Sequence, residues 1–159
     1  MKINPLAGSL LSAAILGALV AVLTQPVARA AEVEKTVVIG ANDTLKFDVT
    51  KIEASPGQAI HVQLQNNGTL PKAIMGHNWI LLDSDGEANR YALAAMSARA
   101  DNYQPKALAS HVLASIPLLG PKEVGNVTFN APSKPGKYPF ICSFPGHMAA
   151  GMRGELIVK

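Results

Sequence analysis

Short apolar runs separated by turn residues occupy most of the chain after its first 30 residues. Residues 45–49 and 59–64 alternate apolar and polar positions, as strands with one buried face do. Residues 55–57 and 66–68 carry turn signals. Further strands are predicted at residues 36–39, 78–82, 125–129, 138–142 and 155–158. Strands this short and this regularly interrupted predict an all-β sandwich with Greek-key connections.

A helical segment interrupts the strand pattern between residues 87 and 110. Residues 87–99 are mostly helix formers, with Leu93 and Met96 three positions apart, and residues 105–110 favour a second short turn. We therefore predict a helical flap inserted between two strands and lying on the outside of the sandwich. The alternative is an irregular loop, which would be unusually long for a compact domain.

The first 30 residues have the features of a secretory signal peptide. A basic opening precedes an apolar run at residues 6–23, and residues 28–30 have the small-x-small form of a cleavage site. Cleavage there leaves a single domain at residues 31–159, which we do not expect to insert stably into a membrane. The alternative is a permanent anchor, because an apolar run of 18 residues is at the lower edge of bilayer-spanning length.

The formal net charge of +3 carries little functional information. Lys2 and Arg29 lie in the predicted signal peptide, so the remaining domain has 12 basic and 11 acidic residues, a net charge of +1. The domain has no basic run and no interleaving of basic with aromatic residues, so nothing in it supports nucleic-acid binding.

Candidate metal ligands cluster near the end of the chain. Cys142 is the only cysteine; His147 lies five residues after it and Met152 five residues further, while His77 lies far upstream. Two imidazoles, a thiolate and a weak thioether are the donor set of a mononuclear blue-copper electron-transfer centre. Taken alone, one cysteine also fits an inert core thiol or a disulfide between chains.

The sequence leaves the roles of several neighbouring residues undecided. Met148 competes with Met152 for the axial position, but it directly follows His147, and an adjacent side chain usually points away from the same centre. Gly76 has no side chain, so its carbonyl can approach the metal on the opposite side. The Asn78 amide either ties the two ligand-bearing segments together or belongs to an ordinary turn.

Two other histidines fit surface roles better than metal binding. His61 alternates with apolar neighbours on a predicted strand, and His111 follows the helical segment. We expect neither to be a ligand.

Residues 70–79 and 142–147 resemble the corresponding segments of azurins, within the cupredoxins, and the similarity extends from about Phe47 to the end of the chain. The resemblance implies a cupredoxin-type Greek-key β-sandwich of about eight strands, with Trp79 buried in its core. It also implies one copper ion, with His77, Cys142 and His147 as equatorial ligands. Met152 and the Gly76 carbonyl would be the axial contacts.

Two departures from azurins concern the ligand loop and the disulfide. It has four residues between His147 and Met152 where azurins have three, a spacing closer to auracyanin-like or plastocyanin-like loops. It also cannot form the disulfide of azurins, since Cys142 is its only cysteine.

The resemblance implies a periplasmic protein that carries single electrons between redox proteins such as c-type cytochromes or periplasmic reductases. The alternative is a periplasmic copper-delivery or storage protein, but the chain has no Met/His-rich tract of the kind that such proteins often use. We do not expect an enzyme, because copper catalysis needs an open coordination position or a second metal. Apolar residues of both ligand segments, including Leu70 and Ile74, are expected to surround a partly exposed His147 and to form a docking patch.

Overall fold

The computed structural model describes residues 34–159, together with Met1. The predicted signal peptide at residues 1–30, apart from Met1, lies outside the described residues and stays a prediction. Within the described part of the chain, no helix is both long and apolar enough to cross a membrane.

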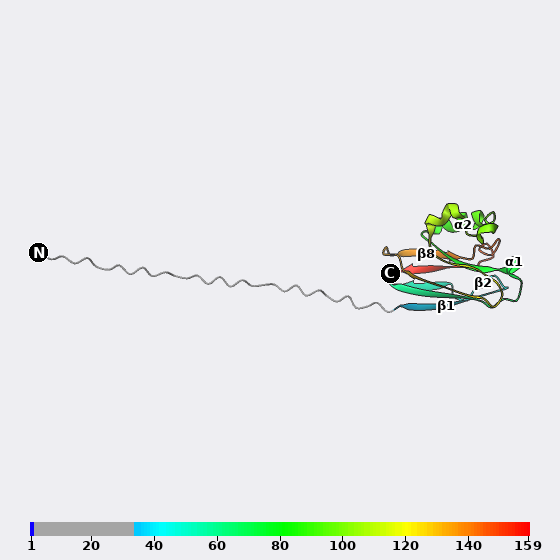
Figure 1. The fold of residues 1–159 in the computed structure, drawn as a ribbon, viewed down its shortest axis with the longest axis horizontal. Helices are drawn as coiled ribbons and strands as arrows, with labels where there is room; N and C mark the ends of the chain where they lie inside the picture. Colours follow the sequence, from blue (N-terminus) through cyan, green and yellow to red (C-terminus); the bar gives the residue numbers. More distant parts are fainter. Residues whose placement is uncertain (2–33) are drawn as a thin grey trace. The chain divides into compact units, whose positions relative to one another are not determined.

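Two β-sheets of four and five strands form the domain (Figure 1). The first sheet has the order β2-β1-β4-β7, and the second β3-β9-β8-β5-β6. The strands are β1 Lys35–Asn42, β2 Lys46–Phe47, β3 Lys51–Ala54, β4 Ala59–Asn66, β5 His77–Leu82, β6 Val112–Leu119, β7 Val124–Asn130, β8 Gly136–Ile141 and β9 Arg153–Val158. Two pairings are parallel, β1 with β4 and β3 with β9, and the others are antiparallel. This arrangement confirms the predicted cupredoxin-type sandwich.

The described residues contain nine strands, and three of them differ from the prediction. The single strand expected at residues 45–49 is the short β2, after which the chain crosses to the other sheet and forms β3. Strand β6 was not predicted, because Pro117 interrupts its apolar run. It is an edge strand, where a residue without an N–H group is tolerated.

The core lies between the two sheets. Alternate residues of β4, namely Ile60, Val62 and Leu64, are fully buried, as the sequence pattern predicted. Trp79 on β5 is also fully buried, and its ring centroid lies 5.5 Å from that of Phe140. The tryptophan therefore has the core position that the resemblance to azurins implied.

The predicted helical flap is present and covers the outer side of the second sheet (Figure 1). It consists of α2 Asp85–Ala95, η1 Arg99–Asp101 and η2 Lys106–His111, between β5 and β6. Its buried Tyr91 and Leu108 pack with Ile80 and Leu82 of β5 in a second apolar cluster. This cover explains why every residue of β5 is buried. The four-residue helix α1, Lys72–Met75, was not predicted.

Candidate metal centre

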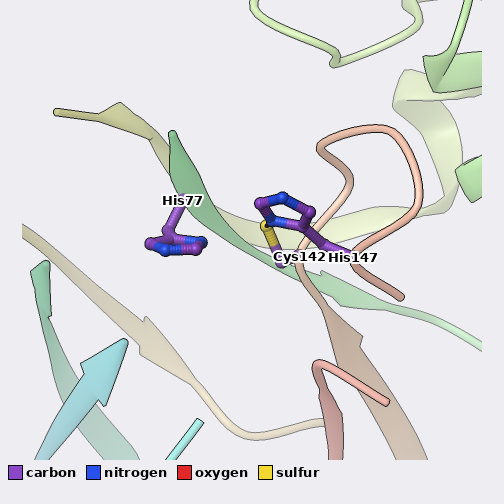
Figure 2. Close-up of side chains that lie close together, drawn as sticks. All are labelled: His77, Cys142 and His147. Carbon is purple, nitrogen blue, oxygen red and sulfur yellow. Dashed lines mark hydrogen bonds between the residues drawn. The ribbon is translucent and has the colours of Figure 1, made fainter. Parts of the chain in front are cut away.

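Three predicted ligands converge at one buried point (Figure 2). One ligand atom each from His77, Cys142 and His147 can be chosen so that all three lie within 4.8 Å of one another. His77 begins β5, Cys142 directly follows β8, and His147 lies in the loop between β8 and β9. Because β5 and β8 are antiparallel neighbours, the start of one lies beside the end of the other. The sheet therefore brings together residues that are far apart in the sequence.

The donor groups of the three residues lie close to one another. Cys142 Sγ lies 3.5 Å from His147 Nδ1, and the two imidazole centroids are 5.0 Å apart. Both ring nitrogens of His77 are buried without a hydrogen-bond partner of good geometry. A buried polar group without a partner costs about 1–3 kcal/mol. Such an imidazole fits a site that binds a metal ion.

Burial sets the protonation states of the three donors. It lowers the pKa of His77, against the opposing effects of Asp43 and the Asn42 carbonyl. Burial and the neighbouring His77 lower the pKa of His147 to about 4. Burial also raises the pKa of the Cys142 thiol to about 11, although the backbone N–H groups of Asn78 and Phe144 act in the opposite direction. At neutral pH the imidazoles are therefore ready to bind a metal, whereas the thiol must release a proton on binding.

Asn78 ties the two ligand-bearing segments together, which decides between its two predicted roles. Its Nδ2 donates to Ser143 Oγ at 2.8 Å, and the Ser143 backbone N–H donates to its Oδ1 at 2.7 Å. Ser143 Oγ in turn donates to the Tyr103 carbonyl at 2.6 Å. These bonds fix the residue after Cys142 to the residue after His77 and to the helical flap.

Three rings in tilted contact, those of Tyr103, Phe144 and His147, link the site to the flap. The ring centroids of Tyr103 and Phe144 are 4.8 Å apart, and those of Phe144 and His147 are 4.6 Å apart. His147 is only 3% exposed, so the expectation of a partly exposed imidazole is wrong. The packing of Phe144 against the imidazole is the physical reason for this difference.

The two methionines of the loop lie in different apolar clusters. Met152 is fully buried in the same cluster as Cys142, and its backbone N–H donates to the His147 carbonyl at 3.0 Å. Met148 packs instead with Ile80 and Tyr91 between the sheet and α2. The two thioethers therefore belong to different environments.

Backbone packing explains the glycine before His77. A Cβ atom on Gly76 would lie 2.7 Å from the Lys72 carbonyl oxygen and 2.8 Å from Leu118 Cγ. A side chain at this position would therefore displace the segment that leads into β5.

The roles of several residues around the site could not be predicted from the sequence. Ser143 lies within the segment 142–147 that resembles azurins, but nothing in the sequence indicated its hydrogen bonds, and Tyr103 lies in no recognisable motif. Asp43 Oδ2 accepts bonds of 2.9 Å from both the backbone N–H and the hydroxyl of Thr69, and this carboxylate partly opposes the lowering of the His77 pKa by burial. Only the fold places these groups near the ligands.

The other two histidines of the described residues lie elsewhere. His61 Nδ1 is 2.9 Å from Thr128 Oγ1. His111 Nδ1 is 3.0 Å from the Asp83 carboxylate, a contact between the flap and the end of β5.

The profile of copper-binding proteins of the plastocyanin/azurin family matches residues 33–159. The chain belongs to this family. Among its relatives, an azurin from Pseudomonas fluorescens biotype C is 34% identical over 129 residues, which cover 79% of this chain and 99% of the azurin. Auracyanin-A from Chloroflexus aurantiacus is 40% identical over 127 residues, which cover 78% of this chain and 74% of the auracyanin.

Solved structures agree with this assignment. The structure of auracyanin A from Chloroflexus aurantiacus, described as a blue copper protein, matches with a TM-score of 0.70 and 36% identity. The match covers 79% of this chain and 99% of the auracyanin. The matched region includes the β-sandwich that positions His77, Cys142 and His147.

Copper is the metal that fits this site. Thiolate suits the reduced ion and imidazole suits both oxidation states. The structure supplies one buried thiol and two buried imidazoles at a single point, as the copper-binding family requires. Cys142 is fully buried, which argues against a disulfide between chains, and it lies beside two imidazoles, which argues against an inert core thiol.

Proposed function

We propose that this protein is a periplasmic electron carrier that transfers single electrons between redox proteins. The observation that carries the proposal is the buried convergence of His77, Cys142 and His147 in a member of the plastocyanin/azurin family. When bound, copper supplies the one-electron chemistry by cycling between Cu(I) and Cu(II).

The fold holds the ligands in place for both oxidation states. His77 is part of a central strand, and the Asn78–Ser143 bonds anchor the start of the ligand loop. The loop is closed at its other end, where the Cys142 N–H donates to the Met152 carbonyl at 3.0 Å. A site held this firmly limits rearrangement when the charge of the metal changes, which favours rapid electron transfer.

Met152 is our proposed axial ligand, with the Gly76 carbonyl on the opposite side. Met152 is buried in the same cluster as Cys142, and its backbone N–H donates to the His147 carbonyl. Both observations support Met152 as the axial ligand. The position of Met148 under α2 argues against that residue. A weak thioether ligand at this position would tune the reduction potential.

The burial of the site favours a carrier over the alternatives. The three ligand residues are each no more than 3% exposed. A copper-delivery or storage protein needs ligands that an acceptor can reach, and an enzyme needs a position where a substrate can bind. A buried site with its ligands fixed by the backbone suits neither need.

The proposed location and partners rest on the sequence. A cleaved signal peptide at residues 1–30 would export the domain to the periplasm. We propose c-type cytochromes or periplasmic reductases as the partner class. Exposed apolar residues beside the site, with Ile74 64% and Leu70 42% exposed, support a docking patch.

Metal retention during redox cycling tests the carrier against the delivery protein. We expect copper to stay bound through repeated reduction and oxidation in the presence of a chelator, with a reversible one-electron titration. Rapid loss of Cu(I) to the chelator would support delivery instead. Zinc can occupy the same ligands, so the metal content must be measured in the same sample.

A further inference from the structure

A groove of about 300 Å³ lies between the helical flap and the ligand loop. Its apolar walls come from Ala92 and Leu93 on α2, from Met96 directly after α2, and from Phe144, Met148 and Ala149 on the loop. Leu93 is 68% exposed and Met96 is 59% exposed. Two large apolar side chains that are this exposed beside one groove are typical of an interaction site.

The groove is connected to the metal centre through one aromatic ring. Phe144 lines the groove, and its centroid lies 4.6 Å from that of the ligand His147. Phe144 is also two residues from Cys142. A group seated in the groove would therefore contact a side chain that packs directly on a metal ligand.

Two cations without a carboxylate partner lie next to residues that line the groove. Lys46 Nζ donates to the Ala150 carbonyl at 2.7 Å, next to the wall residue Ala149. Arg99 follows α2 and lines a separate pocket with Tyr103, whose ring makes a tilted contact with Phe144. Neither cation forms an ion pair among the described residues.

Two carboxylates of the flap are held in ion pairs. Glu87 binds Arg90, and Asp101 binds Lys106. The groove residues themselves carry no charge. Lys46 and Arg99 therefore add unpaired positive charge near the groove, whereas the negative charges of Glu87 and Asp101 are already paired.

We propose that this groove docks an acidic redox protein, whose contact surface is an apolar projection flanked by carboxylates. The projection occupies the groove and contacts Leu93, Met96 and Phe144, while the carboxylates face Lys46 and Arg99. Apolar contact supplies affinity, and the opposite charges speed the encounter and select the partner. The inference rests on the proposed electron-carrier function and specifies its partner.

A cytochrome pair with reversed charge tests the proposal. The probes are a lysine-rich c-type cytochrome and the same cytochrome after succinylation of its lysines. We expect electron exchange with the succinylated form to be faster at low ionic strength by about tenfold, and the advantage to shrink with added salt. Equal rates, or a faster reaction with the lysine-rich form, would overturn the proposal.

Matched variants locate the contact. With the succinylated cytochrome, Leu93→Ser should slow exchange about fivefold, whereas Leu113→Ser, at an exposed leucine on β6, should not. Arg99→Gln should slow exchange about threefold at low ionic strength, whereas Lys134→Gln, between β7 and β8, should have no such effect. If Leu93→Ser and Arg99→Gln exchange electrons as fast as their control variants, the proposal fails. The copper spectrum must be unchanged in all four variants.

A binding measurement separates this inference from the proposed function. Amide NMR signals of zinc-loaded protein, in which no electron moves, should shift at Leu93, Met96 and Ala149 when the succinylated cytochrome is added. Shifts there without electron exchange by the copper protein would support docking and contradict the carrier function. Exchange with no shifts at these residues would overturn the docking site alone.

Discussion

Asn78 and Ser143 exchange two hydrogen bonds of 2.8 and 2.7 Å across the 65 residues that separate them in the chain. Each residue directly follows a ligand, Asn78 after His77 and Ser143 after Cys142. Both side chains are buried, so neither has water as a competing partner. This pair is therefore the direct mechanical connection between the two halves of the metal site.

Removing the Asn78 amide should loosen that connection. In Asn78→Ala, the Ser143 N–H loses its partner inside the protein, and we expect the free energy of unfolding of the metal-free protein to fall by about 2–3 kcal/mol. Copper should also dissociate faster, because the two ligand segments are no longer tied. Chemical denaturation and metal-release kinetics measure these effects.

An exposed asparagine provides the control for that change. Asn126→Ala, on β7, removes an amide whose bond to Gln63 lies at the surface. We expect it to alter stability by less than about 0.5 kcal/mol. Equal effects of the two substitutions would show that the buried pair has no special role.

The two loop methionines should differ in their effect on the reduction potential. Met152→Leu should retain the blue colour and shift the potential, because a weak axial ligand tunes the metal without holding it. Met148→Leu should change the potential much less and act mainly on packing under α2. Voltammetry of both variants checks the assignment, and the reverse ranking would assign the axial position to Met148.

The metal-free protein should lose stability as the pH falls. Burial and the neighbouring His77 lower the pKa of His147 to about 4 in the folded protein, whereas an unfolded histidine titrates near 6.5. Between these values the unfolded chain binds more protons, so the free energy of unfolding decreases as the pH drops from about 6.5 to about 4. The part due to His147 is on the order of 2–3 kcal/mol.

Urea denaturation of the metal-free protein across this pH range measures that effect. His147→Gln should reduce the pH dependence, and His61→Gln should leave it almost unchanged, since His61 lies on β4 away from the site. A stability that does not vary between pH 4 and 6.5 would show that the site histidines are not held neutral by burial.

A charge in the exposed patch beside His77 should slow electron exchange. Ile74 lies in α1, which ends one residue before Gly76, and is 64% exposed, so Ile74→Lys should fold normally. We expect a lower self-exchange rate with an unchanged copper spectrum, because two like charges meet when copies of the protein approach. Val38→Lys on β1 is the matched control, and equal rates for the two variants would exclude the patch from the exchange surface.

The ligand set could be predicted from the sequence because its chemistry is local. Cys142, His147 and Met152 lie in one loop, and their spacing is visible without the fold. His77 needed the antiparallel pairing of β5 with β8 to reach them, and only its donor type and the surrounding motif indicated it. The structure brings His77, Cys142 and His147 together, while the axial roles of Met152 and Gly76 stay proposals.

The parts that could not be predicted depend on tertiary context. Pro117 is compatible with β6 only because that strand lies at the edge of its sheet, which the sequence does not show. Tyr103 has a positive φ of 60° and offers its carbonyl to Ser143, a contact that requires the flap to be in place. The burial of His147 likewise depends on how Phe144 packs against it.

The visible absorption spectrum of the copper(II)-loaded protein tests the central claim most directly. We predict intense colour from thiolate-to-copper charge transfer in the wild type, and its complete loss in Cys142→Ser, with copper content measured in both samples. A colourless wild-type protein with one bound copper ion would contradict a blue-copper site built on Cys142.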